Sequence, residues 1–230
     1  METLPDYLDY NLDIIFVGLN PSIPSVRVGH YFGNPRNRFW TVLNLSGLLP
    51  VHISMEQDHS LLQYGIGLTD LVKRPTPQAS GLTAADYRAG APVLREKLVR
   101  FKPRIVCFHG VTCYRQFLVH GEATRLHREG TKLVPGPQEK SIGSSQVFVT
   151  PNPSPANAQY SVEGLAGWYR ELGKFLAELP PTYPHSLGGK GLEGNGTNYC
   201  SSVPQPPERG ASTPAGLLKP LSFFGFPDGY

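Results

Sequence analysis

The sequence has little cysteine and no long apolar run. Cys107, Cys113 and Cys200 are its three cysteines. An odd number without a C-x-x-C pair argues against a disulfide framework and against a zinc site. No stretch of about 20 apolar residues is present, which argues against a transmembrane helix. The first residues also lack the basic and apolar regions of a secretory signal, so we expect a protein with reduced thiols inside the cell.

The excess of positive over negative charge is also small. Lys and Arg number 21 against 18 Asp and Glu, which gives a formal net charge of +3. A balance this modest is compatible with a local basic face but does not by itself predict nucleic-acid binding. Composition alone therefore leaves the function open.

The composition changes sharply near Pro180. Beyond it Pro, Gly, Ser, Thr and Asn dominate and apolar periodicity disappears. This predicts one folded domain over residues 1–180 and a disordered tail over residues 181–230. The tail ends in apolar residues around Leu217 and Phe223, which are either a short docking motif for a partner protein or a functionless terminus.

Short segments and helical patterns alternate along the folded part. Residues rich in β-branched and aromatic types predict buried strands at Asp13–Val17, Arg104–Phe108 and Gln146–Thr150, with Tyr64–Leu68 as a weaker fourth candidate. Helical patterns cover Asn37–Leu45, Thr83–Arg100 with Thr83 as N-cap, Val111–Val119, and Val162–Leu179 after Ser161. This alternation predicts an α/β sandwich with a parallel sheet.

Two loops after predicted strands have unusual sequences. Ligands of parallel α/β sheets gather at the carboxyl ends of strands, so the loops after Val17 and Thr150 should border one crevice. The first reads G-L-N-P-S at 18–22, and the second reads P-N-P-S-P-A-N-A-Q at 151–159. Rigid loops that carry amides, with aromatics nearby, suit the recognition of a flat heterocycle, as base-flipping enzymes require.

These loops belong to an ordered series of motifs. G-L-N-P-S is followed by G-H-Y-F at 29–32, N-R-F-W at 37–40, Y-G-I-G-L-T-D-L-V at 64–72, R-P-T-P at 74–77, K-P-R-I at 102–105 and the P-N-P-S loop. The series resembles the mismatch-specific uracil/thymine DNA glycosylase family of the uracil-DNA glycosylase superfamily over about residues 12–179. The resemblance implies a three-layer sandwich with a short, mostly parallel four-stranded sheet flanked by helices. It also implies a monofunctional base excision repair enzyme that flips uracil, with thymine as a second candidate, out of G·U or G·T mismatches and hydrolyses the N-glycosidic bond.

The resemblance assigns catalytic roles to Asn20 and His30. The family counterpart of Asn20 positions the water that attacks the anomeric carbon of the deoxyribose. A neutral amide is a poor base, so catalysis must depend on stabilising the departing base, and slow turnover is expected. His30 matches a family histidine near the reacting sugar. Without the surrounding pattern, Asn20 would be a turn residue before Pro21 and His30 a loop residue satisfied by the backbone.

The same resemblance predicts a base pocket lined by Leu19, Ser25, Phe32 and Asp70. Phe32 matches the position that stacks on the flipped base, with core packing as its alternative role. Asp70 stands where relatives commonly carry a neutral amide or a lysine. It either faces the base or caps a short helical turn.

DNA contacts are expected from a basic pair and from the second loop. Relatives insert a bulky or basic residue into the gap left by the extruded nucleotide, whereas this stretch holds Ala156 and Asn157. A small wedge should favour weakened or single-stranded substrates. Asn37 and Arg38 open a helix, where the amide can stabilise the preceding loop and the guanidinium can meet a phosphate; the alternative is a solvated helix start. The residues expected at the DNA are Lys73, Arg74, Ser154, Ala156, Asn157 and Gln159.

The resemblance also implies a monomer without a metal or nucleotide cofactor. Its partners would be double-stranded DNA with G·U or G·T mismatches, single-stranded uracil DNA, and repair proteins that dock on the tail. The location would be nuclear in a eukaryote and cytoplasmic otherwise. An iron–sulfur uracil glycosylase would need four cysteine ligands, and a nucleotide-binding protein would need a glycine-rich phosphate loop after the first strand. A weakly catalytic reader of uracil-containing or abasic DNA stays open as the alternative function.

Overall fold

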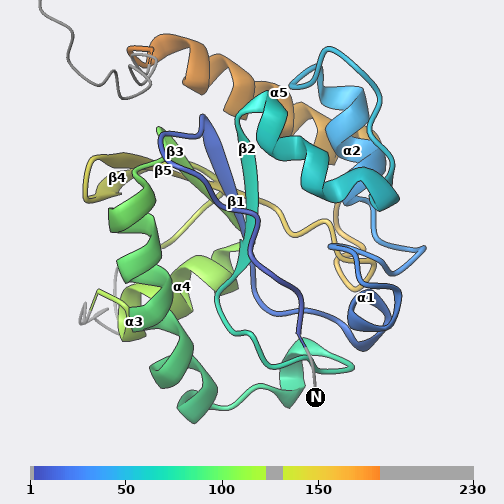
Figure 1. The fold of residues 1–230 in the computed structure, drawn as a ribbon, viewed down its shortest axis with the longest axis vertical. Coiled ribbons are helices and arrows are strands. Elements are labelled where there is room, and N and C mark those ends of the chain that lie inside the picture. The colour runs from blue at the N-terminus through green and yellow to red at the C-terminus, as the bar shows by residue number, and fades with distance from the viewer. Residues whose placement is uncertain (1–2, 123–131, 182–230) are drawn as a thin grey trace, which may run out of the picture. The chain divides into compact units, whose positions relative to one another are not determined.

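Five strands form the central sheet of the computed structural model, which describes residues 3–122 and 132–181 (Figure 1). Their order across the sheet is β2-β1-β3-β5-β4. The predicted tail over 181–230 lies outside the described residues except for its first position. The strands are β1 (Ile14–Gly18), β2 (Ile66–Asp70), β3 (Ile105–His109), β4 (Gly136–Ile142) and β5 (Ser145–Thr150).

Four of these strands are parallel and were predicted from the sequence. β1, β2 and β3 are buried at every position, as expected for strands covered on both faces. The register pairs Gly18 with Asp70 and His109 with Thr150. Because the strands run in the same direction, their carboxyl ends and the loops that follow them meet at one edge of the sheet.

The predicted four-stranded sheet needs one correction, since β4 adds a fifth, antiparallel strand beside β5. Its sequence, G-P-Q-E-K-S-I, lacks the apolar alternation of a half-buried strand, and most of its side chains are solvent-accessible. Pro137 is tolerated there because β4 is an edge strand, where one row of backbone donors faces no neighbour. The sequence therefore carried no signal for this strand.

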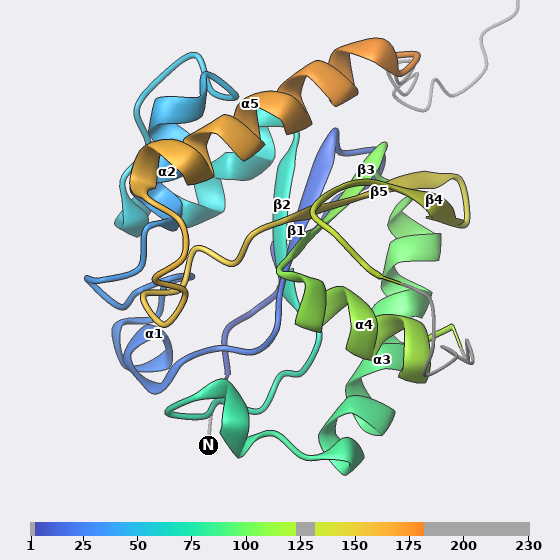
Figure 2. The ribbon, with the colours of Figure 1, turned by 180° about the vertical axis from the view of Figure 1, so that it is seen from behind.

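Helices cover both faces of the sheet (Figures 1 and 2). On one face, α2 (Phe39–Ser46) packs with α5 (Val162–Glu178), and on the other lie α3 (Ala84–Phe101) and α4 (Val111–His120). The predicted N-caps are confirmed: Thr83 accepts from the backbone of Asp86, and Ser161 accepts from Gly164. The short elements α1 (Ile23–Val28), η1 (Met55–Tyr64) and η2 (Ala79–Gly81) were not predicted.

Alternation along the strands divides the core into two halves. Phe16 packs under α2 and α5, whereas its neighbours Ile15 and Val17 pack under α3 and α4. All three side chains are inaccessible to solvent. No helix within residues 3–122 and 132–181 is long and apolar enough to cross a membrane.

Candidate active site

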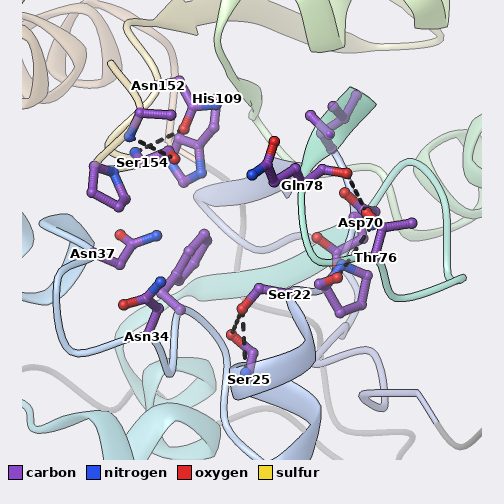
Figure 3. A pocket seen from close by; sticks show the side chains of 18 of the residues that line it. Ser22, Ser25, Asn34, Asn37, Asp70, Thr76, Gln78, His109, Asn152 and Ser154 are labelled. Carbon is purple, nitrogen blue, oxygen red and sulfur yellow. Dashed lines mark hydrogen bonds between the residues drawn. The ribbon is translucent and has the colours of Figure 1, made fainter. Parts of the chain in front are cut away.

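A cleft of about 880 Å³ opens at the carboxyl ends of the parallel strands (Figure 3). One wall comes from residues 76–80, after β2, and the opposite wall from the loop after β5. The loop after β1 and the segment before α2 complete it. The structure brings eight of the predicted site residues together around this cleft: Leu19, Asn20, Ser25, Phe32, Asp70, Ser154, Ala156 and Asn157.

Asn20 lies in the loop that follows β1, and hydrogen bonds from its amide nitrogen fix the orientation of the side chain. Nδ2 donates to Thr76 Oγ1 at 2.7 Å, to the carbonyl oxygen of Arg74 at 3.0 Å and to that of Pro21 at 3.2 Å. Carbonyl oxygens can only accept, so these contacts fix which end of the amide is the nitrogen. The acceptor Oδ1 consequently lies at the opposite end of a fixed amide group.

Phe32 has a left-handed backbone conformation, with φ of 55°. This region is unfavourable for a bulky side chain and is concentrated at functional sites. Its ring stacks on Phe39 with 4.0 Å between centroids and meets His109 edge-on at 5.3 Å. The side chain is half-buried and borders the cleft. One ring therefore joins the aromatic core to the cleft.

Asp70 ends β2 and is buried. Its Oδ2 has no hydrogen-bond partner among the described residues. Burial raises the pKa of this carboxyl to about 7, although nearby Lys73 opposes the shift. Gly18 makes room for the carboxylate, because a Cβ atom at that position would stand 2.3 Å from Oδ1. A carboxyl group that titrates near neutral pH thus borders the cleft.

His109 ends β3 and also borders the cleft, although no sequence argument selected it. It is 2% exposed, and its Nε2 lies 2.9 Å from the hydroxyl of Tyr169. Nδ1 has no hydrogen-bond partner among the described residues. Burial lowers the pKa of the imidazole to about 3, so the ring is neutral at physiological pH. The sequence signal that could have identified His109 is its position directly after a predicted strand.

His30 is not among the residues that line the cleft, although its neighbour Tyr31 is. Its Nδ1 stands 3.2 Å from Oδ1 of the fully buried Asp58. Asp58 also accepts from the backbone nitrogens of Tyr31 and His59, at 2.9 and 2.8 Å. His30 therefore lies beside a carboxylate that anchors the loop before Phe32, and its catalytic role stays a prediction.

Lys73 and Arg74, expected at the DNA, are engaged with carboxylates. Lys73 Nζ lies 2.8 Å from Asp6 Oδ1, and Asp6 also binds Lys97. Arg74 donates to both carboxylate oxygens of Asp86 at 2.7 Å, and this pairing holds the pKa of Asp86 well below its usual range. Neither residue lines the main cleft. Any contact with a phosphate would have to compete with these ion pairs.

Arg38 has a role that the sequence did not predict, because its guanidinium stabilises the second loop. Nε donates to the carbonyl oxygen of Pro153 at 3.3 Å, and Nη2 donates to those of Ser154 and Asn157 at 2.8 and 2.7 Å. Nη1 donates to the carbonyl oxygen of Tyr160. The planar fork of donors therefore fastens residues 153–160 to the start of α2. Asn37 accepts from the backbone nitrogen of Phe39 at the same helix start.

The second loop is also organised internally. Asn152 Oδ1 accepts from the backbone of Ser154 at 2.9 Å, and Asn157 Nδ2 donates to the carbonyl oxygen of Asn152 at 2.9 Å. Ala156 is exposed and lines the cleft, whereas Gln159 is exposed outside it. The Asn157 amide is therefore used within the loop, and Ala156 remains at its exposed turn.

The two remaining predicted pocket residues come from the first loop and α1. Leu19 is half-buried and packs against the core under α3 and α4. Ser25 is buried, and its Oγ accepts from the backbone of Gly33 at 2.9 Å and lies 2.9 Å from Ser22 Oγ. Ser25 thus braces the segment that carries Phe32.

The polar groups that line the cleft are amides, hydroxyls, the Asp70 carboxyl, the neutral His109 imidazole and the Arg36 guanidinium at the rim. Within the described ranges, no group of three or more His, Cys, Asp and Glu side chains is placed to hold a metal ion. Cys107 and Cys113 are buried free thiols, and Cys200 lies outside the described residues. Burial raises the pKa of Cys113 well above its ordinary value. These thiols are consequently poor nucleophiles.

Comparisons with known proteins found similarity over most of the chain. A solution NMR structure from Methanosarcina acetivorans, of a protein proposed to be a uracil DNA glycosylase, is 23% identical and covers 75% of this chain and 98% of its own, with a TM-score of 0.48. The family model of the uracil DNA glycosylase superfamily matches residues 5–174, which include both loops of the cleft. This chain belongs to the uracil DNA glycosylase superfamily.

Proposed function

We propose that this protein is a monofunctional DNA glycosylase that flips uracil, with thymine as a second base, out of mismatches with guanine and hydrolyses the N-glycosidic bond. Superfamily membership supports the glycosylase chemistry. The observation that carries the residue assignment is the fixed amide of Asn20 at the cleft. The product would be an abasic site in the DNA strand.

Asn20 would position the attacking water through Oδ1. Its Nδ2 is occupied by the Arg74 carbonyl and by Thr76 Oγ1, and the Thr76 hydroxyl itself donates to the Gln78 carbonyl at 2.8 Å. Each donor in this chain has an acceptor, so Oδ1 remains to accept from water. Orientation without deprotonation supplies only part of the rate, because an amide is a weak base. The remainder must come from stabilising the departing base.

Phe32 and Asp70 would bind the extruded base. Stacking of a base on an aromatic ring contributes about 1–3 kcal/mol and tolerates either pyrimidine. Below pH 7 a protonated Asp70 could donate to a carbonyl oxygen of the base, given its raised pKa. Above pH 7 the carboxylate could accept the imide N–H but would repel the negative charge of the leaving base. Departure of the base would therefore be favoured by the protonated form.

Ala156 would stand at the gap left by the base. A methyl group fills little of a base-sized gap, so extrusion would depend on weak pairing in the substrate. Mismatched and single-stranded uracil should consequently be better substrates than uracil paired with adenine. The clamp formed by Arg38 would hold this small wedge in place.

Base release from four substrates tests the proposal: duplexes with G·U, G·T and A·U, and single-stranded uracil. We expect release in the order G·U and single-stranded uracil first, then G·T, then A·U, and loss of nearly all release with Asn20→Ala. Gln63→Ala, an exposed amide outside the cleft, is the matched control. Binding of mismatched DNA without single-turnover release by the wild type would instead identify a DNA reader.

A further inference from the structure

Three strand ends lie in a row beneath the cleft. The register pairs Gly18 of β1 with Asp70 of β2 on one side. On the other side Val17 pairs with Phe108, so the next position places Gly18 beside His109 of β3. Asp70 and His109 thus flank a residue without a side chain, and Figure 3 shows them on different sides of the pocket. The glycine leaves both polar groups bordering the same space.

Both groups carry a buried polar atom without a partner among the described residues, namely Asp70 Oδ2 and His109 Nδ1. A buried polar atom that forms no hydrogen bond destabilises the fold, so native proteins rarely keep one without a functional reason. Two residues that border one cleft and each carry such an atom point to a ligand that bonds to both. A pyrimidine base offers carbonyl and imide groups along its edge.

The His109 ring is fixed by its other contacts. Its Nε2 lies 2.9 Å from the Tyr169 hydroxyl, and the ring stacks on Phe16 at 5.1 Å with an interplanar angle of 22°. Burial raises the pKa of Tyr169 well above its ordinary value, so its hydroxyl keeps its proton. A neutral imidazole carries one N–H, and a protonated hydroxyl can either accept from Nε2 or donate to it. When the Tyr169 hydroxyl donates to Nε2, the imidazole proton lies on Nδ1.

We propose that His109 is a base-contacting residue, whose Nδ1–H donates a hydrogen bond to a carbonyl oxygen of the extruded pyrimidine, and that Tyr169 is its positioning residue. The inference rests on the proposed function, because it assigns a further contact to the same cleft. A neutral donor stabilises negative charge on the departing base without holding the product as a permanent cation would. His109 and Asp70 then contact the base from two different strands.

Single-turnover excision with three variants tests the contact. His109→Leu should lower the rate on the order of a hundredfold, as removal of a charge-stabilising donor does. His109→Asn, whose amide nitrogen can take the place of Nδ1, should recover most of that loss. Tyr169→Phe, which keeps the ring and removes the hydroxyl, should give an intermediate rate. Equal rates for His109→Leu and His109→Asn would overturn the proposal.

Two control variants separate this effect from general damage to the core. His120→Leu changes a histidine that stacks on Tyr87 outside the cleft, and Tyr114→Phe removes a hydroxyl from a buried tyrosine outside the cleft. Both should excise at the wild-type rate. Thermal unfolding of each variant shows whether a lost rate merely follows a lost fold, and NMR decides the assignment if His109→Leu does not fold.

Side-chain ¹⁵N NMR of the full chain reports on His109 without any turnover. We expect the Nδ1–H tautomer in the wild type, a shift of this resonance on titration with free uracil, and loss of the single tautomer in Tyr169→Phe. An Nε2–H tautomer, or a His109 signal that ignores uracil, overturns the inference. If the wild type releases no base from DNA but His109 responds to uracil, the proposed function fails and the base contact stands.

Discussion

Asn20 Nδ2 donates a hydrogen bond of 2.7 Å to Oγ1 of Thr76, 56 residues further along the chain. The bond joins the loop after β1 to the segment after β2, at the edge where both strands end. Thr76 is buried and donates in turn to the Gln78 carbonyl. The orientation of the proposed catalytic amide therefore depends on a hydroxyl from a different part of the sequence.

Thr76→Val should slow base excision about fivefold to tenfold, because one hydrogen bond contributes about 1 kcal/mol to the orientation of the amide. Thr76→Ser keeps the hydroxyl and should restore the rate. Single-turnover kinetics on a G·U duplex measures both variants, and the dissociation constant for the same duplex should stay constant. A loss of duplex affinity that parallels the loss of rate would contradict a role in orienting Asn20.

Arg38→Lys should weaken the second loop, since an ammonium group cannot reproduce a planar fork that donates to several carbonyl oxygens. We expect faster amide hydrogen exchange over residues 153–160, a lower melting temperature and weaker binding to mismatched duplexes. Arg36→Lys, at an exposed arginine on the rim of the cleft, is the matched control for exchange and melting.

The same variant distinguishes the loop clamp from the phosphate contact that the sequence suggested for Arg38. A lysine binds phosphate well as a point charge, so a residue that served mainly to contact DNA would keep most of its affinity after the change. Unaltered hydrogen exchange in the second loop, together with retained duplex affinity, would therefore show that the clamp contributes little in solution.

The sequence predicted the parallel strands and long helices because local patterns determine them. Buried runs such as Ile14–Gly18 cannot be solvated, and caps such as Thr83 and Ser161 mark helix starts directly. The edge strand β4 was missed because an exposed strand needs no apolar pattern once β5 supplies its hydrogen bonds. The β4 strand forms because its backbone pairs with β5, and its own residues give no pattern that predicts this pairing.

The site was predictable only where position along the chain is informative. Ligands gather at strand ends, and this rule selected the loops of Asn20 and Ala156. The rule applies equally to His109, which follows a predicted strand but is not part of a familiar motif. Ion pairs of Lys73 with Asp6 and of Arg74 with Asp86 join residues that are distant or unremarkable in sequence. Such partners become visible only when the chain is folded.

Ala156→Arg should strengthen binding to G·U duplexes by a larger factor than binding to single-stranded uracil DNA, because only a duplex has a gap that the longer side chain can fill. Fluorescence anisotropy with both substrates at several salt concentrations measures the difference. Gln159→Arg adds the same charge outside the cleft and serves as the control. Equal gains on both substrates, with the same salt dependence, would indicate simple attraction to phosphates.

Asp70→Asn should stabilise the protein at pH 8 and have little effect at pH 4. Burial raises the pKa of Asp70 from 3.8 to about 7, so the folded state binds more protons than the unfolded state between these values. Stability from this group is fully present below pH 3.8 and is lost as the pH rises through 7. A shift of this size corresponds to roughly 4 kcal/mol, since one pKa unit is about 1.4 kcal/mol.

Urea unfolding between pH 4 and pH 8 measures this prediction, with Asp9→Asn as a control at an exposed carboxylate. His109 acts in the opposite direction, because burial lowers its pKa from 6.5 to about 3 and stability from its neutral ring is lost as the pH falls through that window. Asp70→Asn should therefore abolish the decline toward pH 8 and leave the decline toward pH 4 in place. If the base also contacts Asp70, the excision rate of this variant should lose its dependence on pH near 7. A stability gain of equal size at pH 4 and pH 8 would mean that Asp70 is not the buried titrating carboxyl.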